Sequence, residues 1–174
     1  MKVAVLVLLT LPTVLWSQEA PQTKGSQDLS LYVSPDFEGV TGDMLNLEAG
    51  YGYFLLEKLA LRASIDIATI EDIAPGEKDY RFREIDLGIQ YNFGTGRVIP
   101  YVGASLGFAS LNYLDLSESS FVYGPDGGIE IFFTKKVALD FSVSFRTASK
   151  NVFVNDFVPE DSDLTYDVGL RVVF

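Results

Sequence analysis

Apolar side chains occupy every second position over long stretches of this chain, with polar residues or glycine between them. The pattern is clearest at residues 164–174, which end on an aromatic residue. The apolar positions of this segment are Tyr166, Val168, Leu170, Val172 and Phe174. Because successive side chains of a β-strand point to opposite faces, a period of two predicts a strand with one apolar and one polar face.

The same alternation predicts further strands, separated by turn residues. The eight predicted strands are 28–34, 44–54, 59–70, 80–93, 98–112, 121–133, 137–147 and 164–174. The tight turns between them are 55–58, 94–97 and 134–136, and the longer loops are 35–43, 71–79, 113–120 and 148–163. An even number of strands with alternating short and long connections predicts an all-β fold, an eight-stranded antiparallel up-and-down barrel with its long loops at one end.

Alternation alone does not decide which face of such a barrel points inward. A soluble lipocalin-like barrel would bury the apolar face and bind a ligand there. Two features favour a transmembrane barrel with the apolar face outward: the polar face lacks lysine in mid-strand, and aromatic residues gather at the strand ends as membrane-interface girdles do. The predicted girdles are Tyr53, Tyr91, Phe93, Tyr101, Phe133 and Phe174 at the turn end, and Tyr113, Phe121, Tyr123, Phe153 and Tyr166 at the loop end.

Three segments resemble the OmpA/OmpX-like family of eight-stranded outer-membrane barrels. They are IDLGIQYNF at 85–93, PYVGASLGF at 100–108 and GGIEIFF at 127–133. The resemblance implies an outer-membrane location, with both termini in the periplasm and the long loops outside. The terminal Phe174 and the alternating residues before it resemble the signal that this family presents to the barrel-assembly machinery. Family members have unrelated tasks, so the resemblance indicates architecture rather than activity.

The beginning of the chain resembles a secretory signal peptide. Met1-Lys2 is followed by an apolar run that Pro12 interrupts, too short for the about 20 residues of a membrane-spanning helix. We expect residues 1–17 to be the signal peptide, with cleavage as late as Ala20, residues 18–27 to be a polar segment and 28–174 to be the barrel. Pro125 cannot donate to a sheet, which predicts a bulge or the upper limit of its strand at that point.

The inward face is predicted to hold a network of carboxylates and guanidiniums. Its members are Glu48, Arg62, Asp66, Glu84, Asp86, Glu130, Asp140, Arg146, Asp167 and Arg171. Eight-stranded barrels are filled by side chains, so we favour a network that replaces a hydrophobic core. The alternative, which the resemblance to the OmpA barrel implies, is a narrow ion or small-solute channel that this network gates.

Composition excludes several classes of function. The chain has no cysteine and no histidine, so disulfides, thiolate metal sites and histidine-dependent catalysis are absent, and we expect no enzyme, no cofactor and no metal centre. A net charge of −11 repels nucleic acid, and we expect a monomer without a nucleic-acid partner. We expect instead a structural, surface-interaction or envelope-integrity role carried by four acidic extracellular loops.

Two charged features bear on membrane partners, which include lipopolysaccharide. The long loops contain many acids and only two cations, Lys78 and Lys150. Such oxygen clusters suit Ca²⁺ or Mg²⁺, although we favour loops that simply stay solvated. Arg81 and Arg83 share the parity of the lipid-facing residues at the loop end of strand 80–93. They either contact lipid phosphates or extend above the membrane.

Overall fold

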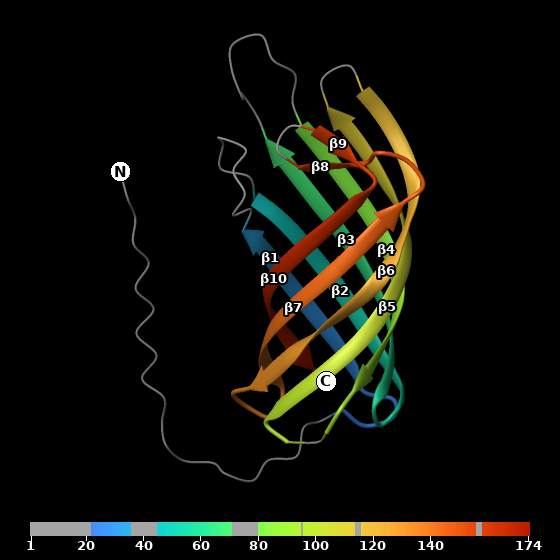
Figure 1. The fold of residues 1–174 in the computed structure, drawn as a ribbon. Coiled ribbons are helices and arrows are strands. Elements are labelled where there is room, and N and C mark those ends of the chain that lie inside the picture. The colour runs from blue at the N-terminus through green and yellow to red at the C-terminus, as the bar shows by residue number, and fades with distance from the viewer. Residues whose placement is uncertain (1–21, 36–44, 71–79, 95, 114–115, 156–157) are drawn as a thin grey trace, which may run out of the picture.

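A computed structural model describes residues 22–35, 45–70, 80–94, 96–113, 116–155 and 158–174. Eight long strands form one closed antiparallel barrel in the order β1-β10-β7-β6-β5-β4-β3-β2 (Figure 1). They are β1 (Gln27–Pro35), β2 (Leu45–Leu56), β3 (Leu59–Ile70), β4 (Tyr80–Asn92), β5 (Val98–Tyr113), β6 (Leu116–Phe132), β7 (Val137–Ala148) and β10 (Ser162–Val173). A separate hairpin consists of β8 (Phe153–Asn155) and β9 (Val158–Glu160). The predicted fold class is confirmed.

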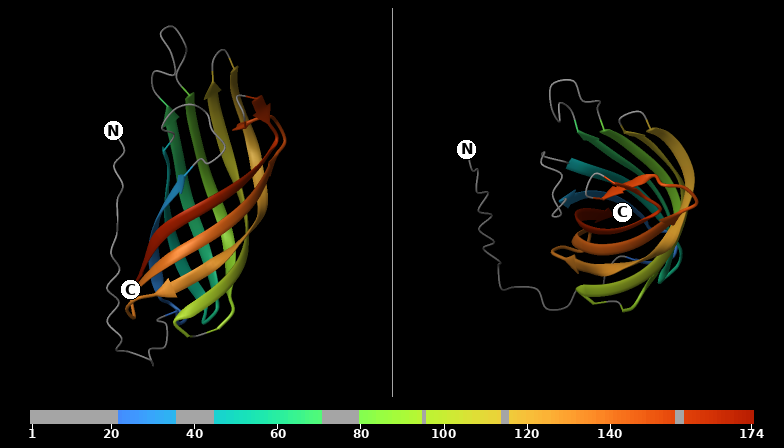
Figure 2. Two further views of the ribbon diagram at one scale, coloured as in Figure 1. Left: turned by 60° about the vertical axis from the view of Figure 1, so that its left-hand side comes forward. Right: turned by 45° about the horizontal axis from the view of Figure 1, so that its top comes forward.

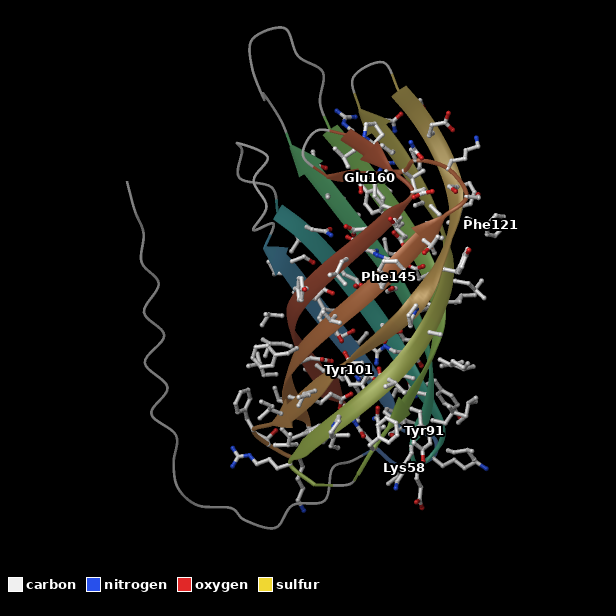
Figure 3. The ribbon with its side chains drawn as sticks, in the orientation of Figure 1. Lys58, Tyr91, Tyr101, Phe121, Phe145 and Glu160 are labelled. Carbon is white, nitrogen blue, oxygen red and sulfur yellow. The ribbon has the colours of Figure 1, made fainter. Side chains whose placement is uncertain are left out.

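The apolar face of every barrel strand points outward. Neighbouring strands pair in register, so that Ile65, Ile85, Phe108 and Phe121 form one row across four strands. Phe121 is 65% exposed and Ile85 61%, and Figure 3 shows Phe121 and Phe145 on the outer surface. A soluble barrel would bury these side chains, so the lipocalin-like alternative is wrong. Within the described residues, no helix is long and apolar enough to span a membrane.

The β5–β6 hairpin is longer than the sequence predicts. The predicted loop 113–120 is wrong, because β5 reaches Tyr113 and β6 begins at Leu116. Ser117 and Ser119 pair with Asn112 and Ser110, although this serine-rich stretch has no apolar alternation. Backbone pairing thus continues where hydrophobic patterning stops, and the hairpin forms the tallest side of the barrel in Figure 1.

The predicted bulge or strand limit at Pro125 is also wrong. Pro125 lies inside β6 opposite Ala104 of β5, and the pairing with β7 has the same register on both sides, at Tyr123 and at Asp126. The ladder to β7 skips Gly124 and Pro125 without an inserted residue. Proline lacks the N–H that the ladder needs, and a Cβ atom at Gly124 would overlap the carbonyl oxygen of Phe145.

Two of the predicted girdle aromatics are buried instead. Tyr101 shares the parity of Ile99 on β5 and points into the lumen, where it is 4% exposed. Phe153 belongs to β8 and packs inside the loop end of the barrel against Phe82, with ring centroids 6.0 Å apart. The side chain of Tyr113 lies outside the described residues. Aromatic type alone therefore misplaced residues whose strand parity or loop position directs them inward.

Candidate functional site

The lumen is polar in its middle and apolar at both ends. The loop-end cluster is Ala68, Phe82, Ala109, Leu111, Val122, Ala148, Val152 and Phe153. The turn-end cluster is Ile99, Phe132, Ala138 and Val173. The hairpin of β8 and β9 lies at the loop end of the barrel, above its mouth (Figure 2). Sequence reasoning missed both clusters, although strand parity places most of their members on the inward face.

Arg171 is the centre of the turn-end half of the network. This fully buried side chain bonds to Glu130 through Nη1, and its Nη2 lies 2.6 Å from Oδ2 of Asp140. Gln90 Oε1 accepts a further bond from Nη1 at 3.3 Å. All three partners are buried, so the guanidinium neutralises charges that water does not reach. The structure therefore brings together Arg171, Glu130 and Asp140, three residues of the predicted charge network.

Two tyrosines complete the surroundings of Asp140. Tyr32 Oη donates to Asp140 Oδ2 at 2.7 Å, and Tyr101 Oη donates to Asp140 Oδ1 at 3.0 Å. The Tyr101 ring also lies 5.5 Å from the Arg171 guanidinium carbon. Each oxygen of the carboxylate therefore has a tyrosine donor, Oδ2 also lies beside the arginine, and these partners compensate its burial. Neither tyrosine was among the predicted network residues.

Arg146 is the centre of the loop-end half. Its Nη1 lies 3.0 Å from Glu84 Oε2 and 3.6 Å from Asp66 Oδ2, while Nη2 lies 3.5 Å from Asp163 Oδ2. The guanidinium carbon lies 5.6 Å from the centroid of the Phe153 ring, so the loop-end cluster covers the ion pairs. Asp163, which the sequence places in a loop, belongs to β10 and joins the network.

Arg62 pairs with a carboxylate that the sequence analysis did not include. Its Nη2 lies 3.3 Å from Asp28 Oδ1 and donates to Ser30 Oγ at 3.0 Å. Its Nη1 donates to Gln90 Oε1 at 3.1 Å. Asp28 is fully buried beside Gly52, where a Cβ atom would collide with the carboxylate. Because Asp28 opens the first predicted strand, its inward parity was the signal that could have found it.

The remaining predicted carboxylates lie around a central cavity of about 100 Å³. Asp167 accepts from Ser34 and, at 3.3 Å, from Ser142. Glu48 and Asp86 line the cavity, and Oδ1 of Asp86 has no hydrogen-bond partner among the described residues. Asp126, another residue that the sequence analysis missed, lines it too. Within the described part of the chain, no group of three or more carboxylates is arranged to hold a metal ion.

The amino-terminal segment places a polar side chain, Gln22, in the turn end of the lumen, where it acts as a polar stopper. Gln22 is buried, donates to Glu130 and accepts from Asn92 Nδ2 at 2.6 Å. Gly25, whose φ of +88° suits glycine, turns the chain so that its N–H donates to Phe54 O at 2.8 Å. The predicted polar segment thus inserts one side chain into the lumen. Residues 1–21, with the predicted signal peptide, lie outside the described residues.

The other predicted residues lie on the outer surface. Arg81 and Arg83 are exposed on β4. The five residues of the predicted assembly signal alternate outward along β10 and its end, and Phe174 exchanges two backbone hydrogen bonds with Gln27, each 2.9 Å long. The barrel therefore closes at the terminal residue.

The sequence also matches a known protein family. The family model of the outer membrane protein beta-barrel domain covers residues 3–174. The chain belongs to this family. No curated protein matches the chain.

Solved structures share the fold of this outer-membrane barrel at low sequence identity. The amino-terminal β-barrel domain of Pseudomonas aeruginosa OprF is 16% identical with a TM-score of 0.65, covering 90% of this chain and 100% of that one. Neisserial surface protein A is 21% identical with a TM-score of 0.57, covering 86% and 95%. The outer membrane enzyme PagL is 13% identical with a TM-score of 0.50, covering 83% and 98%. These likenesses concern the fold alone.

Proposed function

We propose that this outer-membrane barrel is a non-conducting structural protein that presents its loops at the cell surface, in a surface-interaction or envelope-integrity role. The observation that carries this proposal is the closure of the lumen. Apolar clusters fill both ends, Gln22 adds a stopper, and three arginines cross-link the buried carboxylates between them. A lumen filled in this way provides rigidity in place of a hydrophobic core.

The orientation in the membrane is part of the same proposal. Short turns of outer-membrane barrels face the periplasm and longer loops face outward. Applied to this chain, the rule puts both termini and the tight turn that contains Lys58 in the periplasm, and the β8–β9 hairpin outside. Protease added to whole cells should then cleave at the β8–β9 end and leave an epitope inserted at Lys58 inaccessible. Labelling of the Lys58 epitope on intact cells would contradict the orientation.

Surface partners would meet the acidic loops. Most acids of these loops lie in 36–43 and 71–79, outside the described residues, so their role and their binding of divalent cations stay predictions. At the described rim, Lys150 Nζ pairs with Glu118 Oε2 at 2.9 Å. If loops bridge lipopolysaccharide through divalent cations, chelation with EDTA should lower the thermal stability of the reconstituted barrel. Unchanged stability would remove the cation from the proposal.

Absence of catalysis is also proposed rather than given by the fold, since an enzyme shares it. The chain lacks histidine, so the lumenal Ser142, which donates to Asp167 Oδ2 at 3.3 Å, has no imidazole base to activate it. A lack of acyl release when the purified barrel is incubated with lipopolysaccharide would agree with this reasoning. Acyl release by the wild-type barrel would contradict the absence of catalysis. Release that persists in a Ser142→Ala variant would place the activity at a site other than Ser142.

The second candidate is a narrow channel, which the charged central cavity favours. Conductance across planar bilayers decides between the two functions. We expect no single-channel steps from the wild-type barrel. Phe153→Ala together with Gln22→Ala removes a plug from each end, whereas Phe121→Ala on the outer surface is the matched control. Steps from the wild type that disappear in Arg146→Met would establish the channel and remove the closed-lumen proposal.

A further inference from the structure

A polar band interrupts the apolar outer surface of the barrel at the loop end of three strands. Arg81 and Arg83 of β4 pair in register with Asn112 and Ser110 of β5, which pair in turn with Ser117 and Ser119 of β6. The alternation of each strand directs all six side chains outward. We name Arg81, Arg83, Ser110, Asn112, Ser117 and Ser119 the outer-leaflet band.

The band presents hydrogen-bond donors and no carboxylate. Ser117 Oγ donates to Asn112 Oδ1 at 2.9 Å, so the amide Nδ2 of Asn112 is left to donate outward. Ser119 Oγ donates to Ser110 Oγ at 3.3 Å, which leaves the Ser110 hydroxyl hydrogen available. Guanidinium forks, an amide and a hydroxyl on one surface match the oxygens of a phosphate ester.

Arg81 and Arg83 supply the positive charge on the outward face of the described barrel strands. Among the described residues of the eight barrel strands, Arg81 and Arg83 are the charged side chains that alternate outward; the carboxylates of these strands share the lumenal parity. The chain as a whole carries a net charge of −11, which opposes contact with anionic lipid. A local pair of arginines is therefore what would bind an anionic headgroup to this protein.

The height of the band fits a headgroup. The outward residues of β5 from Val98 to Phe108 are apolar or small, and ten residue steps tilted by about 40° span about 25 Å, the height of the apolar belt of such barrels. Ser110 is the next outward position. Directly below the band, Phe108 and Phe121 form an edge-on pair with centroids 5.8 Å apart and are 50% and 65% exposed. Acyl chains would lie against these rings while phosphates meet the band.

We propose that the outer-leaflet band binds the phosphorylated headgroup of a glycolipid of the outer leaflet, lipid A of lipopolysaccharide, with the acyl chains on the Phe108–Phe121 pair. This proposal rests on the orientation proposed above, which places the loop end in the outer leaflet, whereas a conducting lumen would leave the band intact. Arg83 and Arg81 bind the phosphates, and Asn112 and Ser110 hydrogen-bond to the headgroup.

The test is binding of diphosphoryl lipid A to the detergent-folded mature barrel, measured by native mass spectrometry and by titration of a fluorescent lipid A. We expect Arg81→Ala/Arg83→Ala to weaken binding about tenfold, the loss of one to two charge-assisted hydrogen bonds. Arg81→Lys/Arg83→Lys keeps the charge without the planar fork, so its affinity for lipid A should lie between those of the wild type and the double alanine variant. The matched control is Lys135→Ala/Lys136→Ala, which removes two exposed charges at the opposite end and should bind as the wild type does.

Heat-modifiable migration on SDS gels shows that each variant is folded before it is compared. Equal affinity of the wild type and the double alanine variant would overturn the proposal. Equally tight binding of lipid A without its two phosphates would also overturn the proposal, because the band would then not bind the phosphates of the headgroup. Inorganic phosphate that binds as tightly as lipid A would overturn the assignment to a lipid.

Discussion

Replacing Arg171 by methionine tests whether the lumenal network holds the barrel together. The side chain is fully buried, and the substitution leaves Glu130 and Asp140 without their guanidinium while keeping a side chain of similar length. Removing one partner of a buried ion pair costs about 3–5 kcal/mol, because the charge that remains is neither hydrated nor compensated. Tyr32, Tyr101 and Gln90 still donate to the two carboxylates, which keeps the expected loss within this range.

The assay is urea unfolding of the mature barrel in lipid vesicles. The one tryptophan, Trp16, lies in the predicted signal peptide, so far-UV circular dichroism and heat-modifiable migration replace tryptophan fluorescence. Lys135→Met, at an exposed turn residue, is the control, and we expect a change within about 0.5 kcal/mol. A wild-type unfolding midpoint for Arg171→Met would refute the reasoning.

A triple variant separates unpaired charge from lost packing. Arg171→Met with Glu130→Gln and Asp140→Asn removes all three charges and keeps the shapes of the side chains. Replacing a whole buried ionic group is often close to neutral, so the triple variant should recover most of the stability that Arg171→Met loses. A triple variant no more stable than the single one would assign the loss to packing.

Three further substitutions probe other parts of the barrel. Ile89→Arg places a charge on the lipid face, where Ile89 is 54% exposed and pairs with Ala104 near the middle of the apolar belt, and should cost about 2–4 kcal/mol, measured by the same urea unfolding; wild-type stability would contradict the outward assignment. Gly169→Ala should cost about 1–3 kcal/mol, because the added methyl group collides with the Tyr32 ring and the carbonyl oxygen of Leu31. Tyr101→Phe removes one donor to Asp140 and should cost about 1–3 kcal/mol, whereas Tyr123→Phe on the outer surface should be nearly neutral.

The alternation of side chains was enough to predict most of the strands, and the absence of mid-strand lysine on the polar face predicted that this face points inward. It failed where other forces act: the serine-rich start of β6 pairs through its backbone without apolar alternation, and Pro125 is accommodated inside a strand by local loss of ladder bonds. For Tyr101 the alternation was right and the aromatic criterion was wrong, because the parity of this residue on β5 directs it into the lumen. A strict count of parity would have placed Asp28, Tyr101 and Asp126 in the lumen.

The sequence by itself determined that this chain closes into a barrel with an apolar outside and a charged inside, because a strand's period of two separates two faces and the polar face lacks the mid-strand lysines of a solvated surface. Only the tertiary structure decided which charges meet. Arg171 reaches Glu130, 41 residues away, and Tyr32, 139 residues away, through the register and tilt of strands that are distant in sequence. The same closure brought Gln22 and Phe153 to opposite ends of the lumen, since both belong to segments outside the barrel wall whose positions no periodicity encodes.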